Sequence, residues 1–481
     1  MNLRIDKKLA ALALLGALVL GACDSGGTAT VPRPTGTTAQ STAVKGTPAV
    51  PLPKPTAQIP GSNSTSQVPA AQPSTAATAV ATTTVKPVGA TPTVSGTTSS
   101  GVTPEADTTE EGALVLTAQK LGTAAGGFGD GRTINLPPGF KIQVYATNLN
   151  GVRWLGLSPD GVVYATLKAD GRVVTLKDTN NDGVSDEVTT FADNVGAVQG
   201  IDFHDGAVYV ANEGQIIRLQ DTNNDGKADK KDVIADDLPT GGGHSTRTIA
   251  FGPDGNLYVS AGSSCNVCVE TNEKRAAISL YSADGKFQRV YAKGLRNSVG
   301  IVFNSLTGDL WATNNGRDEL GDNIPPETIY NIQDGANYGW PYCYGNQIMD
   351  KTQDVPAGYC AKTTGPAVEM QAHSAPLGLA FYTGSMFPAS YKGDLFVAFH
   401  GSWNRSVPTG YKVVRIRFAN NQPSTTAGDL LVEDFATGWN DSGDVWGRPV
   451  DPMVAPDGSL LLTDDAASVI YRIYYTGDKA T

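Results

Sequence analysis

The chain reads Thr248-Ile249-Ala250-Phe251-Gly252-Pro253-Asp254-Gly255 near its centre, followed at once by Asn256-Leu257-Tyr258-Val259. Apolar residues on both sides of a Pro-Asp-Gly turn are typical of two short antiparallel strands joined by a hairpin. Related copies begin at Gly156, Gly200, Gly300, Gly378 and Pro452. Six such units at spacings of 44 to 78 residues, without helical periodicity of useful length, predict an all-β six-bladed β-propeller.

The copies also predict which residues share one face. If the first strand of each copy is innermost in its blade, the segment before it and the residue after the second strand meet at the same mouth of the central channel. This register collects mainly basic and polar residues: His244, Arg296 and Arg448 four positions before a copy, Gln199 and His373 one and five before, and Asn315, His400 and Asp465 after second strands. Clustered cations are unfavourable unless an anion is held among them. The alternative is that the Arg residues pair with nearby carboxylates and the His residues are structural.

The amino terminus has the order of a bacterial lipoprotein signal. A short basic segment precedes an apolar run over residues 9–22 that is too short to cross a bilayer and ends at Cys23. We expect a signal peptide over 1–22 and a lipid on Cys23 that anchors the protein to the outer side of the bacterial membrane; an ordinary secretory signal is the alternative. Residues 23–130, rich in Thr, Ser, Ala and Pro, predict a disordered tether, and the propeller is expected over 131–478.

Charge limits the partners of the chain. Its 481 residues include 36 Lys and Arg against 47 Asp and Glu, a formal net charge of −11. Binding of duplex nucleic acid needs a basic stripe on one face, so we expect no nucleic-acid partner. The part of the chain beyond about residue 110 is long enough to bury a large core, whereas the preceding part is too poor in apolar side chains to do so.

Several segments in collinear order carry a family resemblance. They are residues 242–255 (Gly-Gly-His-Ser-Thr-Arg-Thr-Ile-Ala-Phe-Gly-Pro-Asp-Gly), 294–297 (Gly-Leu-Arg-Asn), 309–311 (Asp-Leu-Trp), 337–341 (Asn-Tyr-Gly-Trp-Pro), 400–405 (His-Gly-Ser-Trp-Asn-Arg) and 447–449 (Gly-Arg-Pro). Together they resemble the pyrroloquinoline-quinone (PQQ)-dependent sugar dehydrogenases, nearest to the L-sorbosone dehydrogenase branch and similar to the soluble aldose dehydrogenases. The resemblance covers roughly residues 135–475.

The resemblance implies an enzyme that oxidises a sugar or sugar aldehyde, with PQQ as its redox cofactor. His244 would be the general base that removes the hydroxyl proton while the C–H hydride moves to the quinone. Arg296 and Asn297 would flank the quinone oxygens, and Arg296 would stabilise the negative charge that develops there.

The resemblance also implies residues that bind the cofactor. PQQ is a tricarboxylate, and Arg448 would bind one of its carboxylates. Gln199 would touch either the cofactor or the substrate. In the glucose-oxidising branch a Lys after the second strand of the fifth copy contacts the cofactor. This chain has His400 and Arg405 in that region, and both stay open as its counterpart.

A calcium ion that polarises the quinone is implied as well. The family binds it with consecutive backbone carbonyls, which correspond here to Gly316 and Arg317, where the glucose-oxidising branch has Gly-Pro. Asp318 and Asp322 are further candidate ligands, directly or through water. A solvated acidic loop is the alternative explanation for these carboxylates.

Two other loops resemble part of an EF-hand calcium loop. Both place oxygen-bearing side chains at positions 1, 3 and 5 before a Gly at position 6: Asp178, Asn180 and Asp182 in one, Asp221, Asn223 and Asp225 in the other. Neither has Glu at position 12. The predicted strand order puts both loops on the face opposite the mouth, where we expect structural calcium sites or, alternatively, metal-free Asn-Asp-Gly hairpins.

The remaining cysteines fit an exported protein. Disulfides between Cys265 and Cys268 and between Cys343 and Cys360 are the nearest pairings. A zinc site from all four would require two distant loops to converge. A redox role for the first pair lacks the strand-helix pattern of a thioredoxin. We therefore favour two structural disulfides.

Three functional hypotheses follow. The first is a PQQ- and calcium-dependent sugar dehydrogenase that passes electrons to an external quinone or cytochrome. The second is a calcium-dependent propeller lactonase, which needs carboxylate and Asn ligands that converge on one metal. The third is a non-catalytic propeller that binds glycans or protein, for which a rim of exposed aromatic side chains is expected. The cationic mouth favours the first.

Overall fold

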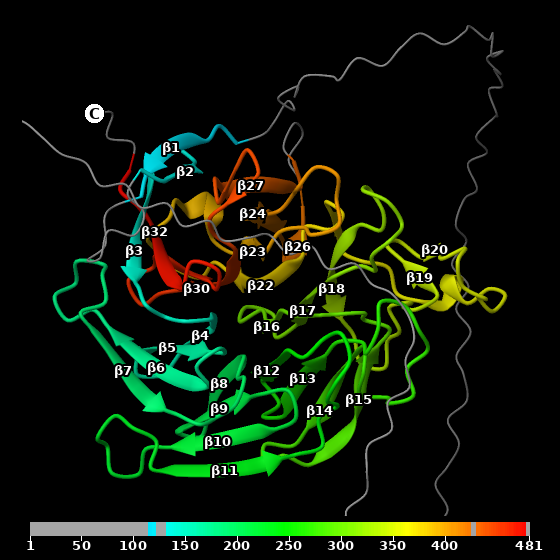
Figure 1. The fold of residues 1–481 in the computed structure, drawn as a ribbon, viewed down its shortest axis with the longest axis horizontal. Helices are drawn as coiled ribbons and strands as arrows, with labels where there is room; N and C mark the ends of the chain where they lie inside the picture. The colour runs from blue at the N-terminus through cyan, green and yellow to red at the C-terminus, as the bar shows by residue number, and fades with distance from the viewer. Residues whose placement is uncertain (1–113, 122–130, 425–429, 478–481) are drawn as a thin grey trace, which may run out of the picture. The chain divides into compact units, whose positions relative to one another are not determined.

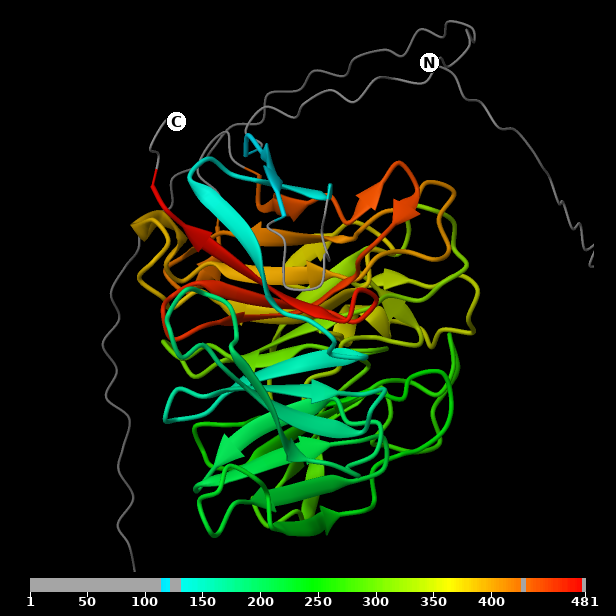
Figure 2. The same ribbon diagram turned by 60° about the vertical axis from the view of Figure 1, so that its left-hand side comes forward.

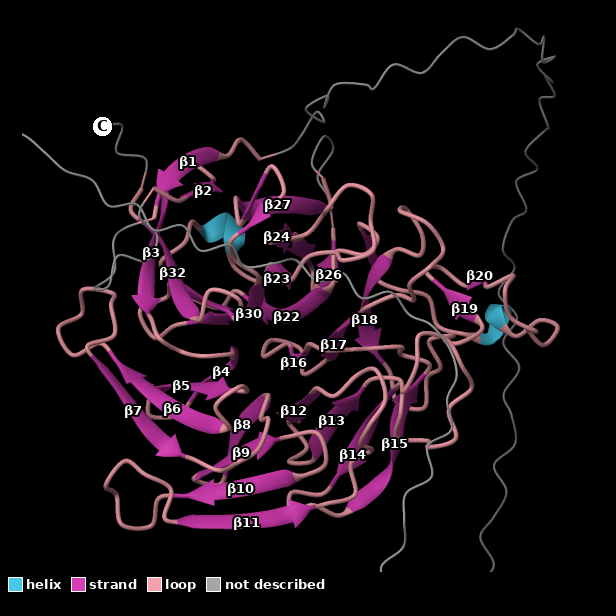
Figure 3. Cartoon of the chain, in the orientation of Figure 1, coloured by secondary structure: helices cyan, strands magenta, loops and turns pink. Residues whose placement is uncertain are grey.

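The computed structural model of the chain describes residues 114–121, 131–424 and 430–477, within a unit that spans Ser99–Thr481. The expected signal peptide over 1–22, Cys23 and most of the expected tether lie outside the described residues. The described part consists of strands and loops, with the single-turn 3-10 helices η1 (Cys360–Lys362) and η2 (Ala389–Tyr391) (Figure 3). None of its helices has the length and apolar character needed to span a membrane.

Six sheets are arranged around a central axis, as the propeller prediction requires (Figure 1). Blade 1 contains β4 (Val152–Leu157), β5 (Val163–Leu167), β6 (Arg172–Lys177) and β7 (Glu187–Ala192). Blade 2 contains β8 (Gly200–His204), β9 (Ala207–Ala211), β10 (Ile216–Gln220) and β11 (Lys230–Ala235). Blade 3 contains β12 (Arg247–Phe251), β13 (Leu257–Ala261), β14 (Ala277–Tyr281) and β15 (Phe287–Lys293). Blade 4 contains β16 (Ile301–Phe303), β17 (Leu310–Asn314), β18 (Glu327–Ile332) and β21 (Val368–Met370).

The last two blades close the ring. Blade 5 contains β22 (Pro376–Phe381), β23 (Leu395–Phe399), β24 (Lys412–Ile416) and β27 (Val432–Thr437). Blade 6 contains β30 (Pro449–Val454), β31 (Leu460–Asp464), β32 (Val469–Tyr475) and, as its outer strand, β3 (Phe140–Ala146). Because β3 pairs with β32, strands from the two ends of the propeller share one sheet (Figure 2). Short hairpins in the loops are β19 (Cys343–Tyr344) with β20 (Ile348–Met349), β25 (Phe418–Ala419) with β26 (Gln422–Pro423), and β28 (Asn440–Asp441) with β29 (Asp444–Val445).

Blade 5 carries two additional strands. β1 (Thr117–Lys120) pairs with β2 (Thr133–Leu136), and Asn135 pairs with Thr437 in β27. Residues 117–120, within the tether expected over 23–130, thus form a strand. The cause is an apolar segment that reaches Leu121, which is buried among the side chains between blades 5 and 6. β2 also pairs with the otherwise unprotected edge of β27.

The core consists of six hydrophobic clusters, one between each pair of neighbouring blades. Between blades 1 and 2, for example, Trp154, Val173 and Phe191 cluster with Ile201 and Val208. Successive side chains of a strand point to opposite faces of its sheet, and here both faces are covered by other blades. This is why strands such as β9 and β23 are buried along their whole length.

The first strands of the six blades line the axis, as predicted (Figure 1). In blades 1, 5 and 6 the register with the second strand shifts near the mouth, and such bulges re-aim side chains. A cavity of about 350 Å³ lies among the far halves of these strands and is lined by Trp154, Asp202, Phe251 and Asp451, among others. The predicted site residues do not line this cavity.

Candidate active site

The predicted residues come together at one end of the propeller. Gln199, His244, Arg296 and Arg448 lie just before first strands, and Asn315, His400 and Asp465 directly follow β17, β23 and β31. Hydrogen bonds connect them across blade boundaries. Asn315 Nδ2 donates to Pro376 O at 2.7 Å, and Arg448 Nε donates to His400 O at 3.0 Å.

His244 is held as a neutral base. Its Nδ1 lies 2.8 Å from Ser263 O, a carbonyl that can only accept, so Nδ1 carries the proton and Nε2 keeps its lone pair. Burial and, next, the charge of Arg296 lower the pKa of His244 to about 4. Gly262 packs against the histidine, and a Cβ at that position would lie 2.7 Å from His244 Cβ. The imidazole is thus fixed in orientation and uncharged at neutral pH.

Arg296 is buried beside this base and uses its whole guanidinium. Nε donates to Asn266 O at 2.9 Å, Nη1 to Gly316 O at 2.7 Å, and Nη2 to Asn266 Oδ1 and Asp318 Oδ2, both at 3.0 Å. Burial lowers the pKa of Arg296, and the ion pair with Asp318 opposes that shift. Part of the Arg296 charge is therefore compensated by a carboxylate, as the alternative interpretation of the mouth anticipates.

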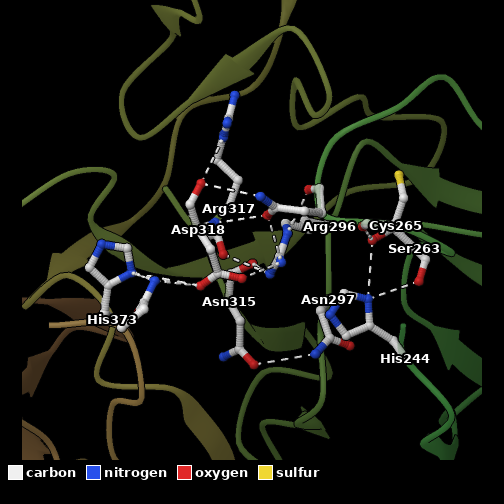
Figure 4. Close-up of polar contacts among 12 residues, drawn as sticks. His244, Ser263, Cys265, Arg296, Asn297, Asn315, Arg317, Asp318 and His373 are labelled. Carbon is white, nitrogen blue, oxygen red and sulfur yellow. Dashed lines mark hydrogen bonds and ion pairs between the residues drawn. The ribbon is translucent and has the colours of Figure 1, made fainter. Parts of the chain in front are cut away.

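Figure 4 shows these side chains as a row from blade 5 to blade 3, with His373, Asp318, Arg296, Asn297 and His244 in that order. Asn297 Nδ2 donates to Asn315 Oδ1 at 3.3 Å. His373 is buried, and its Nε2 lies 2.9 Å from Gly321 O and 3.1 Å from Ile324 O. Because both partners are carbonyls, Nε2 donates, and His373 holds the 321–324 loop in place.

A second charged group lies where blades 5, 6 and 1 meet. Asp465 contacts His400 Nε2 at 2.9 Å and Arg153 Nη1 at 2.6 Å. Burial opposes ionisation of Asp465, but the bond to His400 and the charge of Arg153 outweigh it and lower the Asp465 pKa. Burial lowers the pKa of His400 to about 4, although Asp465 acts in the opposite direction. The residues at the mouth thus include carboxylates that balance some of the cations there.

Arg448 differs from these paired cations. Its guanidinium donates to the carbonyls of His400 at 3.0 Å and Gly401 at 3.2 Å and lies 5.9 Å from the centroid of the Tyr411 ring. Within the described part of the chain, no carboxylate contacts it. Its charge is available for an anionic ligand.

A sequence model of the TrAA12-like family matches residues 134–476, which is the whole propeller. The chain belongs to the TrAA12-like family. An uncharacterized protein of Borreliella burgdorferi is 32% identical over 371 residues, which cover 71% of this chain and 91% of that protein.

One further relative carries a functional description, and a solved structure shares the fold. A pyrroloquinoline quinone-dependent pyranose dehydrogenase of Coprinopsis cinerea is 29% identical over 293 residues, which cover 48% of this chain and 39% of that enzyme. Among solved structures, the calcium structure of a family AA12 carbohydrate-active enzyme of Trichoderma reesei aligns with a TM-score of 0.62 at 21% identity, over 71% of this chain and 96% of that one. That likeness concerns the fold.

Two cations at the mouth of this TrAA12-like chain are not among the residues predicted from the sequence. Arg153 lies inside β4 and donates Nη2 to Gln199 Oε1 at 3.2 Å in addition to its ion pair with Asp465. Lys168 directly follows β5, and burial and, next, the charge of Arg153 lower its pKa. Only Lys168 was within reach of the sequence register, because it holds in blade 1 the position that Asn315, His400 and Asp465 hold in theirs.

Two residues predicted to contact the cofactor make contacts with protein groups. Gln199 is 1% exposed, and its amide is used by Arg153 and by Thr248 Oγ1, to which Nε2 donates at 2.9 Å. It therefore supports Arg153. Arg405 donates to Ala372 O at 3.2 Å. Of the two alternatives left open, His400 is the one that contacts Arg448.

The predicted calcium loop is engaged with protein groups. Gly316 O and Asp318 Oδ2 both accept from Arg296. The Arg317 side chain points away from them and pairs with Asp350 at 2.7 Å, and Asp322 accepts the backbone N–H of Ser406 at 3.1 Å. Asp322 is thus drawn into the contact with the 400–406 loop.

The two EF-hand-like loops connect β6 to β7 and β10 to β11, on the face opposite the mouth, as predicted. Their carboxylates cap backbone amides in the same way. Gly183 N donates to Asp178 and Gly226 N to Asp221, both at 2.8 Å. Asp182 and Asp225 accept the N–H two residues on, and Asn180 and Asn223 accept from Asp182 N and Asp225 N. The turns are explained without a metal, and calcium binding there stays a prediction.

The two disulfides join Cys265 to Cys268 and Cys343 to Cys360, the pairings that the sequence favours. The first closes a ring of four residues next to Arg296, and the second ties the β19–β20 hairpin to η1.

Proposed function

We propose that this protein is a PQQ-dependent dehydrogenase that oxidises a sugar or sugar aldehyde of the aldose or L-sorbosone type. One observation carries the proposal. A neutral imidazole with a free Nε2 lies beside a buried guanidinium from the next blade, at a mouth where Arg448 has no carboxylate partner among the described residues. The name of the Coprinopsis relative, a pyrroloquinoline quinone-dependent pyranose dehydrogenase, supports the choice of cofactor and substrate class.

The donors at the mouth fit a tricarboxylate. Arg448 and Lys168 are cations without a carboxylate contact among the residues described, and Arg153 and Arg296 add two more beside Asp465 and Asp318. Arg153 Nε and Arg405 Nε are buried N–H groups that have no hydrogen-bond partner within the part of the chain that the structure describes. When bound, PQQ supplies an ortho-quinone that accepts a hydride from the sugar.

The residues of this chain then have distinct tasks. His244 Nε2 removes the proton from the substrate hydroxyl, and Ser263 O stabilises the resulting imidazolium through Nδ1–H. Arg296 presents a fixed positive charge to the oxygen that becomes negative, and Asn297 stands next to it. Arg448 would bind a carboxylate of the cofactor.

We include calcium in the proposal, with Gly316 O, Arg317 O, Asp318 and Asp322 as its candidate ligands. Carbonyl and carboxylate oxygens are the donors that Ca²⁺ prefers. In the present arrangement Gly316 O and Asp318 bind the Arg296 guanidinium, so a positive charge already lies where these oxygens meet. Calcium binding would require these oxygens to be shared with or released from Arg296. The Trichoderma structure described with calcium supports testing the ion.

The location and the electron acceptor belong to the same proposal. Lipidation at Cys23 would hold the propeller at the outer side of the membrane, where an external quinone or cytochrome takes the electrons. Labelling with a radioactive or clickable fatty acid, compared with a Cys23→Ser variant, tests the anchor. A Cys23→Ser variant that leaves the membrane but still incorporates the label would contradict lipidation at Cys23.

The activity is tested on the purified chain supplied with PQQ, Ca²⁺ or both. Reduction of an artificial dye is followed with a panel of aldoses, L-sorbosone and simple alcohols. We expect turnover only in the presence of PQQ, and higher turnover with Ca²⁺ than with EGTA. Hydrolysis of lactones without PQQ, or no PQQ binding at micromolar concentration, would refute the proposal.

A further inference from the structure

The Cys265–Cys268 disulfide lies in the segment that contacts both reactive side chains. Ser263 O accepts the Nδ1–H of His244, and Ser263 Oγ donates to Cys265 O at 2.6 Å. Ser263 N in turn donates to Arg296 O at 2.7 Å. Ser263 is fully buried. The segment therefore connects the imidazole of His244 to the first residue of the disulfide ring.

Asn266, inside the same ring, connects it to the guanidinium. Its backbone O accepts from Arg296 Nε at 2.9 Å and its Oδ1 from Arg296 Nη2 at 3.0 Å. The same Oδ1 accepts from Asp318 N at 2.8 Å, and Trp340 Nε1 donates to Asn266 O at 3.3 Å. A single residue thus holds the Nε and Nη2 edge of Arg296 and the backbone of its ion-pair partner.

We infer that the disulfide-closed segment 265–268 is a positioning element, and that Asn266 is its positioning residue. It fixes the Arg296 guanidinium relative to the His244 imidazole. The inference rests on the proposed function, because only that function needs the two groups at a set separation. It adds a role to a disulfide that the sequence indicates only as a structural staple.

The chemistry of the contacts supports this role. Both Asn266 acceptors are neutral, so they orient Arg296 without compensating its charge further than Asp318 already does. A ring of four residues closed by one covalent bond has few conformations. Without the disulfide, the loop that ends at the exposed Val269 would gain conformations. Loss of angstrom-level placement costs about 10²-fold in rate.

The chain provides a matched control in its second disulfide. Cys343 and Cys360 close a longer loop, at a sequence separation of 17. Among the described contacts, neither bonds to His244, Arg296 or Asn297. Removing either disulfide lowers stability, but only the first is expected to affect the relative placement of the base and the guanidinium.

The experiment compares Cys265→Ser/Cys268→Ser with Cys343→Ser/Cys360→Ser, and Asn266→Ala with Asn266→Asp. Turnover and the PQQ dissociation constant are measured for each PQQ-loaded protein, and thermal melting for each unloaded one. Long-range ¹H–¹⁵N spectra of the cofactor-free proteins report the His244 tautomer without any turnover. We expect about 10- to 100-fold lower kcat for Asn266→Ala and for the first cysteine pair. Asn266→Asp keeps the acceptor but adds a negative charge beside Arg296, so it should keep the wild-type His244 spectrum while its kcat falls.

The outcomes separate this inference from the proposed function. Mixed His244 tautomers in the first cysteine pair, with the Nδ1–H form kept in the second, support the inference even if no variant oxidises sugar. Equal losses of kcat in both cysteine pairs, or wild-type turnover and spectra in Asn266→Ala, would overturn it. Should the first cysteine pair fail to fold, the two Asn266 variants decide.

Discussion

Replacing His244 by Asn removes the base while keeping its structural bond. The Asn side chain can donate its amide N–H to Ser263 O, which takes the place of the 2.8 Å bond from Nδ1, but it has no counterpart of the Nε2 lone pair. With a pKa of about 4, almost all of His244 is the free base at pH 7. The variant therefore loses the whole contribution of general-base catalysis, which is about 10²- to 10⁴-fold.

The low pKa of His244 limits the expected loss of kcat. A weaker base contributes less, so we expect kcat to fall about 10²- to 10³-fold, or about 3 to 4 kcal/mol in activation free energy. The PQQ dissociation constant should change by less than about 3-fold, because Arg448 is untouched. Dye-coupled turnover and fluorescence titration with PQQ measure the two quantities separately.

The control is another histidine of the same propeller. His204 ends β8 at the opposite end of the channel, where it stacks on Phe251 with ring centroids 4.3 Å apart. His204→Asn should leave kcat unchanged. His244 is not the general base if His244→Asn keeps more than a third of the wild-type kcat, or if both substitutions lower kcat equally.

The other predictions concern Arg448, a packing contact of His244, two buried histidines and the EF-hand-like loops. Arg448→Ala should weaken PQQ binding about 10- to 150-fold, the value of a charged hydrogen bond, with near-normal kcat at saturating PQQ; unchanged affinity in a fluorescence titration would contradict it. Gly262→Ala should lower kcat more than it lowers the melting temperature, because the new Cβ would meet Asn297 Oδ1 and His244 Cβ; full activity would show that these side chains need not be held. In the cofactor-free protein, NMR titration should show His244 and His400 neutral at pH 6 and protonated only as the pH falls through about 4; a midpoint near 6.5 for His244 would remove the case for a buried base. Calcium should raise the melting temperature of wild type but not of Asp178→Ala/Asp221→Ala if the far-face loops bind it; an equal rise in both would place the ion elsewhere.

Much of the fold was predictable because it depends on local pattern. The Pro-Asp-Gly hairpins fix antiparallel pairs, and the repeat fixes their number. The same register predicts that His244, Arg296 and Arg448 share one mouth, because each stands at the same offset from its strand. That rule needs no knowledge of which side chains touch.

The features that could not be predicted from the sequence depend on contacts between distant segments. Gln199 has a ring position in the sequence, but it faces Arg153 and Thr248 and is completely buried. Arg153 lies inside a strand and was passed over, because the bulge in β4 that accompanies its turn toward Asp465 has no signature in the sequence. Residues 117–120 follow an apolar segment but are mostly polar themselves, and they form a strand by pairing with β2.

The mouth loops are held by buried carboxylates that never appear in a motif. Glu327 accepts the backbone N–H of Gly316 at 2.7 Å and of Ala375 at 3.2 Å, and burial raises its pKa to about 7. Asp464 accepts the N–H of Arg448 at 2.8 Å, and burial raises its pKa to about 6.

Each of these acids loses hydration in order to fix a backbone segment that carries a site residue. The position of Arg448 therefore depends on Asp464, and that of Gly316 on Glu327, although neither acid belongs to the ring. A chain that kept the motif residues but lost these acids would keep the family pattern and lose the geometry. Sequence similarity at the ring alone is for this reason a weaker indication of activity than the placement of Arg448 and Gly316 by their buried partners.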